Sequence, residues 1–422
     1  SHILKHSCSQ QGFLHALFTD CLIPVSFIRL HRMKRAVRSW LLVFFFITFL
    51  LLYSLLHEST PSFLYSYCPI IAEQLIVPEG SASLEERLTI NVRPNEQPRI
   101  ILFHEGDYYS PIDMSEIQRS CPEWNCLLTK DKDLAEEADI VITTPTSGYK
   151  RTHADQYVTV VDIEPPFFST HKRAPIPDMF NFSFSYIHGS VGSVPYAWTL
   201  KLPESEWKPL EQVLTVHKML FKTHAVAWFS SHCETESKRE LYIEQLWKHI
   251  NIEMFGECFN ASACPRRGVC ESELDYKYYF YIAFENQVCR DYITEKVWKL
   301  GLGHFSIPLI LKRSIAEPYL PPHSFIAADD FSSPKQLADY LHYLMANRTA
   351  YLEYFHWRMR YQVIVKYEQV PTAVHKIFGI CQLCRLAWEN PRPRLILQDY
   401  NEFYWNSCEK SGELVNRLLR YD

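Results

Sequence analysis

The longest uncharged stretch of the chain restricts its topology more than any other feature. Residues 39–56 carry no charged side chain and are rich in Leu and Phe. A run of about this length can cross a bilayer as a helix. Four basic residues lie just before it: Arg32, Lys34, Arg35 and Arg38. Because basic residues favour the cytosolic side, we expect a single-pass type II membrane protein whose bulk lies in the lumen.

A cleaved signal peptide is the alternative interpretation of this run. Signal peptides usually have a shorter apolar region, and no small-x-small cleavage pattern closes this one. We therefore predict a cytoplasmic tail at 1–38, a transmembrane signal-anchor at 39–57 and a stem at 58–97. The segment MKRAVRSW, which begins at Met33, resembles the start of a signal-anchor protein. Residues 1–32 could therefore be an extension of the gene model.

The cysteine content agrees with an oxidising lumen. The chain has 13 Cys, and disulfides are the default state of cysteines in that compartment. Zinc is the rival for Cys381-x-x-Cys384, but no second close pair of Cys or His accompanies it. Three N-glycosylation sequons are also present, at Asn181, Asn260 and Asn347.

The composition is that of a globular protein with more than one domain. The chain has 422 residues, of which 47% are hydrophobic and 22% charged. This length exceeds that of one ordinary domain. The net charge of −5 indicates no nucleic-acid partner.

Beyond residue 98, short apolar runs alternate with amphipathic segments. The predicted strands are 99–103, 139–143, 157–163, 225–229, 252–255, 278–284, 307–311 and 324–328, and the predicted helices are 236–250, 292–302 and 334–345. Such alternation predicts an α/β fold of two Rossmann-like domains that face a cleft. We place the first domain at 98–219 and the second at 220–380, with a C-terminal tail at 381–422.

The densest group of polar residues is FENQVCRDYITEKVW, at positions 284–298. We predict a strand that ends at Phe284 and a helix that opens near Asp291, a residue suited to capping. On that helix Tyr292, Glu295 and Lys296 would share one face near the N-terminus, where an anion is favoured. Lys296 could then neutralise a phosphate, while Glu295 and Asn286 hold sugar hydroxyls. An ordinary amphipathic helix would show the same spacing.

This segment resembles the signature of the α1,3-fucosyltransferase family, and YLPPHSFI at 319–326 continues the match. The resemblance implies a GT-B fold, GDP-fucose as donor substrate, and no metal or other cofactor. It places Arg239 at the donor diphosphate. The other donor-binding residues that it implies are Ser231, Glu285, Asn286, Tyr292, Glu295 and Lys296.

The resemblance also implies a catalytic base. The family has a Glu in a matching context in the acceptor domain, and VDIEPP at 161–166 makes Glu164 the candidate. Glu164 would deprotonate the acceptor hydroxyl in a single inverting displacement, although a lone Glu at a strand end is often only solvated. Asp131-Lys-Asp133 is similar to a metal-binding DxD motif, but we interpret it as a solvated charge cluster.

The family's disulfides can be carried over in the same way. They imply that Cys121 and Cys126 bond to Cys381 and Cys384 and so connect the two domains, with the pairing left open. Cys233 and Cys258 would form a further bond inside the donor domain.

Two segments depart from the family pattern. Residues 185–191 lack the expected arginines, and 306–313 lacks a Gly near the ligand. His232 also stands where many members have Asn. These departures leave the donor contacts and the activity itself open.

The overall expectation is an enzyme of the Golgi membrane that transfers fucose to a glycan or glycoprotein acceptor in α1,3 linkage. One alternative is a protein O-fucosyltransferase of the same family. The other is an inactive, membrane-anchored glycan-binding homologue.

Overall fold

The computed structural model describes residues 74–77, 84, 86–90, 96–105, 114–168, 179–214, 222–259, 269–365 and 372–420. The predicted cytoplasmic tail, transmembrane segment, most of the stem and Asn260 lie outside these ranges. Among the helices that the structure does describe, none has both the length and the apolar character needed to cross a bilayer.

A five-stranded parallel sheet forms the centre of the first domain, in the order β2-β1-β3-β4-β5. Its strands are β1 (Arg99–Phe103), β2 (Cys126–Thr129), β3 (Ile140–Thr143), β4 (Tyr157–Asp162) and β5 (Phe182–Ser185). Every residue of β3, β4 and β5 is buried, as in a parallel sheet covered on both faces. The predictions for β1, β3 and β4 are confirmed. We missed β5 because its FSFS sequence alternates polar and apolar residues.

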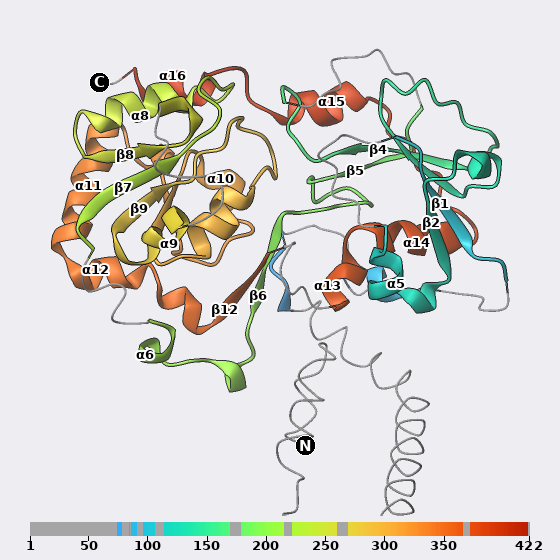
Figure 1. The fold of residues 1–422 in the computed structure, drawn as a ribbon, viewed down its shortest axis with the longest axis horizontal. Helices are drawn as coiled ribbons and strands as arrows, with labels where there is room; N and C mark the ends of the chain where they lie inside the picture. Colours follow the sequence, from blue (N-terminus) through green and yellow to red (C-terminus); the bar gives the residue numbers. More distant parts are fainter. Residues whose placement is uncertain are drawn as a thin grey trace, which may run out of the picture.

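The C-terminal part of the chain returns to cover this sheet (Figure 1). Helix α14 (Ile380–Trp388) packs on β1 and on α5 (Glu116–Ser120), and α13 (Thr372–Ile377) also packs on α5. Leu383 and Trp388 share one buried cluster with Ile101 and Trp124. The predicted boundary at 380 is therefore wrong, because residues 372–388 belong to the first domain.

A second five-stranded parallel sheet has the order β11-β10-β9-β7-β8. Its strands are β7 (His224–Phe229), β8 (Ile252–Phe255), β9 (Tyr278–Ile282), β10 (Ile307–Ile310) and β11 (Ile326–Ala327), all of them predicted with small differences at the ends. The helices of this domain are α8 (Arg239–Trp247), α9 (Val269–Tyr276), η8 (Lys296–Leu302), α10 (Arg313–Ala316), α11 (Pro334–Ala346), α12 (Arg348–Glu353) and α16 (Glu413–Leu418).

The two domains are joined by an antiparallel pair of strands, β6 (Ala197–Lys201) and β12 (Tyr361–Val365), which lies between the sheets in Figure 1. Helix α15 (Tyr400–Tyr404) lies beside the first domain before the chain crosses back to α16. The remaining short helices are η3 (Glu86–Leu88), η4 (Pro122–Trp124), η5 (Lys132–Glu136), η6 (Glu204–Glu206), α6 (Leu210–Val213), η7 (Glu257–Phe259), η9 (Ala328–Asp330), η10 (His356–Met359) and η11 (Trp405–Ser407). The two parallel sheets confirm the predicted α/β fold class.

Two disulfides attach α14 to the first domain. They are Cys121–Cys381 and Cys126–Cys384, which resolves the pairing that the sequence left open. Because α14 belongs to the first domain, these bonds do not connect the two domains as we expected. Cys233–Cys258 joins the loops that follow β7 and β8, inside the second domain as expected.

Candidate active site

Glu164 lies where the two domains meet. It follows β4, and its Oε2 accepts a hydrogen bond of 3.0 Å from the hydroxyl of Tyr292, which comes from the loop after β9. Three residues further on, the backbone N–H of Phe167 donates to Oε1 of Gln287 over 3.2 Å, also across the junction. The carboxyl end of one sheet is therefore in direct contact with the corresponding end of the other, where α/β proteins bind ligands.

Hydrogen bonds to the backbone hold the Glu164 turn in place. The Tyr196 hydroxyl donates to the carbonyl oxygen of Ile163 over 3.0 Å, and the Tyr404 hydroxyl donates to the carbonyl oxygen of Glu164. Burial raises the pKa of Glu164 to about 7, although the Tyr292 hydrogen bond and the positive charge of Lys296 oppose this rise. A carboxylate with a pKa near neutrality suits a general base.

Lys296 lies between two carboxylates rather than facing open solvent. Its Nζ is 3.1 Å from Oε2 of Glu285 and 3.4 Å from Oε1 of Glu295, and it also donates to the Thr294 hydroxyl over 2.9 Å. Although burial favours the neutral amine, these two carboxylates raise the pKa of Lys296. Lys296 is therefore a charged donor whose position the protein fixes in advance.

Glu285 is the centre of this small network. Burial raises its pKa, while Lys296 opposes the rise. The backbone N–H and the hydroxyl of Thr294 also donate to its carboxylate, over 2.7 and 3.0 Å. The Glu295 side chain is about half exposed, and Lys296 lowers its pKa against the effect of burial. Glu285 thus positions Lys296, whereas Glu295 lies nearer to solvent.

The predicted helix at 292–302 is wrong at its start. The regular part begins at Lys296 and is a π-helix, η8, so Tyr292 lies before the helix in irregular backbone. Asp291 has φ 63°, and its carboxylate accepts bonds from the His188 backbone N–H over 3.1 Å and the Tyr319 hydroxyl over 2.5 Å. Asp291 therefore connects the two domains instead of capping a helix. Irregular backbone, and not the repeat of a helix, therefore determines how Tyr292 is placed relative to Lys296.

Arg239 and Asn286 provide buried polar atoms without partners. Arg239 is 1% exposed and donates to the Phe284 carbonyl over 2.5 Å and to the Ser230 hydroxyl over 3.2 Å. Its Nε and the Oδ1 of the buried Asn286 have no hydrogen-bond partner among the described residues. A buried polar atom left unpaired costs stability unless a ligand or water satisfies it. Ser231 is partly buried and directly follows Ser230 in the loop after β7.

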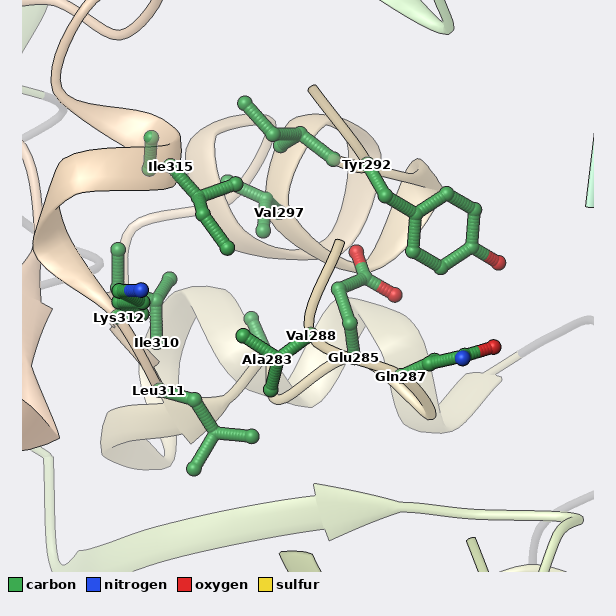
Figure 2. A pocket seen from close by; sticks show the side chains of 12 residues that line it. Ala283, Glu285, Gln287, Val288, Tyr292, Val297, Ile310, Leu311, Lys312 and Ile315 are labelled. Carbon is green, nitrogen blue, oxygen red and sulfur yellow. The ribbon is translucent and has the colours of Figure 1, made fainter. Parts of the chain in front are cut away.

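A small pocket of about 30 Å³ lies at the carboxyl ends of β9 and β10. Figure 2 shows Tyr292 and Gln287 pointing to the same side of it, with Glu285 between them and Lys312 at the other end. The Lys312 Nζ is 2.5 Å from Oε1 of Glu409. Lys312, within the segment 306–313 that lacks the expected Gly, is therefore paired with the C-terminal segment.

Several features of this region had no role predicted from the sequence: Gln287, Lys312, Tyr404, Glu409 and the disulfide Cys289–Cys408. The disulfide attaches the C-terminal segment to the loop that carries Tyr292. The only available signal was that Cys289 lies inside the FENQVC motif and that Cys408 had no assigned partner.

The segment 185–191, where arginines were expected, lies at the domain junction. The ring of His188 packs on that of Tyr319 with centroids 4.2 Å apart, and burial lowers the pKa of His188 to about 3. An uncharged imidazole at this position contributes packing to the junction and no positive charge for a diphosphate.

The DxD-like motif has a local structural role. The Asp131 carboxylate accepts from the backbone N–H of Asp133 over 3.1 Å and caps η5, and both side chains are exposed. We expect the double variant Asp131→Asn/Asp133→Asn to retain activity within about threefold, because both carboxylates follow the edge strand β2, which β1 and β3 separate from the strand β4 that precedes Glu164. Steady-state assays of this variant with and without EDTA would check this prediction, and a large loss would assign the motif to catalysis.

The sequons differ in accessibility. Asn181 is 9% exposed, its Nδ2 donates to Leu395 over 2.8 Å and its Oδ1 accepts from the Val158 N–H over 2.7 Å. A bulky glycan does not fit such a buried amide, so the folded structure argues against the predicted glycosylation at Asn181. Asn347 is partly exposed and caps α12, and glycosylation there stays a prediction.

Comparison with known proteins identifies the family. Residues 219–403 match the family model of glycosyltransferase family 10 (fucosyltransferase), C-terminal part. The alpha-(1,3)-fucosyltransferase fut-1 of Caenorhabditis elegans is 36% identical over 358 residues, which cover 84% of this chain and 81% of that protein. The chain is a member of the α1,3-fucosyltransferase family. The predicted family membership is therefore confirmed.

More distant relatives of this fucosyltransferase include two named enzymes. The glycoprotein 3-alpha-L-fucosyltransferase A of Drosophila melanogaster is 32% identical and covers 57% of this chain and 48% of its own. Human FUT5, a 4-galactosyl-N-acetylglucosaminide 3-alpha-L-fucosyltransferase, is 31% identical, and the match covers 67% of this chain and 74% of FUT5. A solved α1,3-fucosyltransferase with GDP-fucose aligns with a TM-score of 0.46 at 14% identity, over 78% of this chain and 99% of that one.

Proposed function

We propose that this fucosyltransferase moves L-fucose from GDP-β-L-fucose to a hydroxyl of a glycan or glycoprotein in α1,3 linkage, with inversion at the anomeric carbon. The observation that carries the proposal is the Glu164–Tyr292 contact, which holds a carboxylate with a pKa of about 7 beside the Lys296 network. The names of the relatives agree with the linkage, and one solved α1,3-fucosyltransferase was determined with GDP-fucose.

The displacement needs a base, a nucleophile and a leaving group. Glu164 accepts the proton of the acceptor hydroxyl as that oxygen forms a bond to the anomeric carbon of fucose. The bond from that carbon to the GDP oxygen breaks on the opposite face, through an oxocarbenium-like transition state. The electron pair leaves with GDP.

Lys296 and Arg239 stabilise the charge that builds on the departing diphosphate. Lys296 is already oriented by Glu285, so little reorganisation is needed during the reaction. The unpaired Nε of Arg239 and Oδ1 of Asn286 suit a polar donor substrate. These residues need no metal to supply positive charge at the diphosphate.

Anchoring in the Golgi membrane completes the proposal. The apolar run at 39–56 and the basic residues before it support a single-pass type II anchor, with the two domains in the lumen. The four disulfides that join described residues agree with an oxidising compartment.

The decisive experiment is an assay of the full-length chain with GDP-fucose and three acceptors. These are N-acetyllactosamine glycans, a glycopeptide with the N-glycan core, and a folded protein domain with free Ser and Thr hydroxyls. Mass spectrometry and NMR of the products would identify the linkage, and an α1,3-fucoside is the expected result. Fucose only on Ser or Thr would favour the O-fucosyltransferase alternative. GDP or glycan binding without turnover would favour the inactive homologue.

The pH dependence should show the pKa of Glu164. Because the base acts in its ionised form, we expect kcat/KM to fall about tenfold per pH unit below pH 7 and to level off above it. The Tyr292 hydrogen bond favours the ionised carboxylate, so Tyr292→Phe should raise this pKa and move the acidic limb to higher pH. A profile of kcat/KM from pH 5 to 9 tests both statements. If the acidic fall of kcat/KM in Tyr292→Phe occurred at the same pH as in the wild type, the Tyr292 hydrogen bond would not affect the group that titrates.

A further inference from the structure

The turn after Glu164 displays one exposed aromatic ring. Phe167 is 55% exposed, although the residues around it are largely buried. A single exposed apolar side chain is ordinary on a protein surface and needs no explanation by itself. The position of this ring, three residues after the candidate base, is what makes it informative.

Contacts from both domains fix the backbone that carries this ring. The Phe167 N–H donates to Oε1 of Gln287 in the second domain, and the Phe168 N–H closes a turn onto the Pro165 carbonyl over 2.9 Å. Glu164, at the start of the same turn, is held by Tyr292 from the second domain. The carboxylate and the ring are therefore fixed relative to each other by the same loop, residues 284–292.

The neighbouring ring completes the support. Phe168 meets Phe167 edge-on, with centroids 5.3 Å apart and planes at 77°. On its other side Phe168 packs against His232 of the second domain, at 5.4 Å. Phe167 thus rests against a chain of ring contacts that spans the junction, while more than half of its own surface stays open to solvent. A ring immobilised in this way loses little entropy when a ligand covers it.

We propose that Phe167 is a stacking platform for the pyranose ring of the acceptor sugar. The proposal rests on the function proposed above and names a residue that sets acceptor affinity. One face of a β-linked pyranose presents C–H groups with little polarity, and these pack on the electron-rich face of an aromatic ring. Phe has no hydrogen-bonding atom, so it positions the sugar by stacking and leaves the reacting hydroxyl to Glu164.

The test varies the ring and measures acceptor and donor separately. The full-length chain is assayed with whichever of N-acetyllactosamine and the core glycopeptide reacts faster, at saturating GDP-fucose. We expect Phe167→Ala to raise the acceptor KM about tenfold, equivalent to about 1.4 kcal/mol. GDP affinity and the acceptor-independent hydrolysis of GDP-fucose should not change, because the proposal places the ring on the acceptor and not on the donor.

Two further substitutions at position 167 test whether an aromatic ring, and not only an apolar side chain, is needed. Phe167→Trp should return the acceptor KM to within about threefold of the wild type, whereas Phe167→Leu, apolar but without a π face, should not. Trp247 on α8 is equally exposed at 55%, so Trp247→Ala is the matched control and should leave every parameter unchanged.

The possible outcomes distinguish a failure of the Phe167 proposal from a failure of the proposed fucosyltransferase activity. An unchanged acceptor KM in Phe167→Ala, or full recovery by Leu, would overturn the platform while the wild type still transfers fucose. A parallel loss of GDP affinity would also overturn it, because the ring would then act on the donor side. Absence of transfer by the wild type itself would instead contradict the proposed function.

Discussion

Replacing Glu164 by Gln should lower kcat for fucosyl transfer by about 10²–10⁴-fold, the usual contribution of a positioned base. Glutamine keeps the size of the side chain, and its carbonyl oxygen can still accept the bond from the Tyr292 hydroxyl. The fold and the donor site should therefore survive, so GDP affinity measured by calorimetry should stay within about twofold. Initial rates with GDP-fucose and the preferred acceptor provide the main measurement.

The control for this variant is Glu136→Gln, an exposed glutamate of the same domain in η5. It should be as active as the wild type. If Glu164→Gln turned over at more than a tenth of the wild-type rate, another group would have to accept the proton. In that case the approach of Tyr292 to Glu164 would be a structural contact only.

Replacing Lys296 by Ala should affect both donor affinity and stability. It removes the cation that we propose to lie beside the diphosphate, and we expect GDP affinity to fall by about 10–100-fold, because one charged hydrogen bond would be lost. It also leaves Glu285, which is 11% exposed at its side chain, without its cation. Breaking such a pair destabilises the fold, here by up to about 3 kcal/mol. Calorimetry and thermal unfolding measure the two effects.

A double variant separates these two effects. In Lys296→Ala/Glu285→Gln the buried carboxylate is neutral, so much of the lost stability should return, whereas GDP affinity should stay low. Lys299→Ala is the matched control, because this lysine lies on the same helix and pairs with Glu271 at the surface. Normal GDP affinity in Lys296→Ala would remove Lys296 from the diphosphate site and leave it as a partner of Glu285.

Much of the α/β architecture could be predicted from the sequence because it depends on local composition. Strands such as β3 and β4 are buried on both faces and are therefore almost wholly apolar. By contrast, β5 was missed because its sequence FSFS alternates polar and apolar residues. The edge strand β2 was missed as well, and only one of its four residues is buried. The polar residues of the motif at 284–298 could be singled out because they are read directly from residue types, and their role at a donor site stays a prediction.

The arrangement of that motif depended on distant partners. Asp291 adopts a left-handed conformation while its carboxylate bonds to His188 and Tyr319, and no local pattern signals these contacts. They prevent the helix from starting before Lys296, which is why the predicted face of Tyr292, Glu295 and Lys296 does not exist. The same holds for the C-terminal chain, whose return to the first domain is a matter of packing and disulfide partners.

The family, the two-domain α/β class and the candidate base could all be inferred from the order of the residues, because apolar runs and motifs are properties of neighbouring residues. How these parts meet became clear only from the folded chain. Folding brings Glu164 to Tyr292 and Phe167 to Gln287, pairs separated by 128 and 120 positions. Contacts of this kind arise from the packing of whole domains, and burial at that junction is what raises the pKa of Glu164 to about 7.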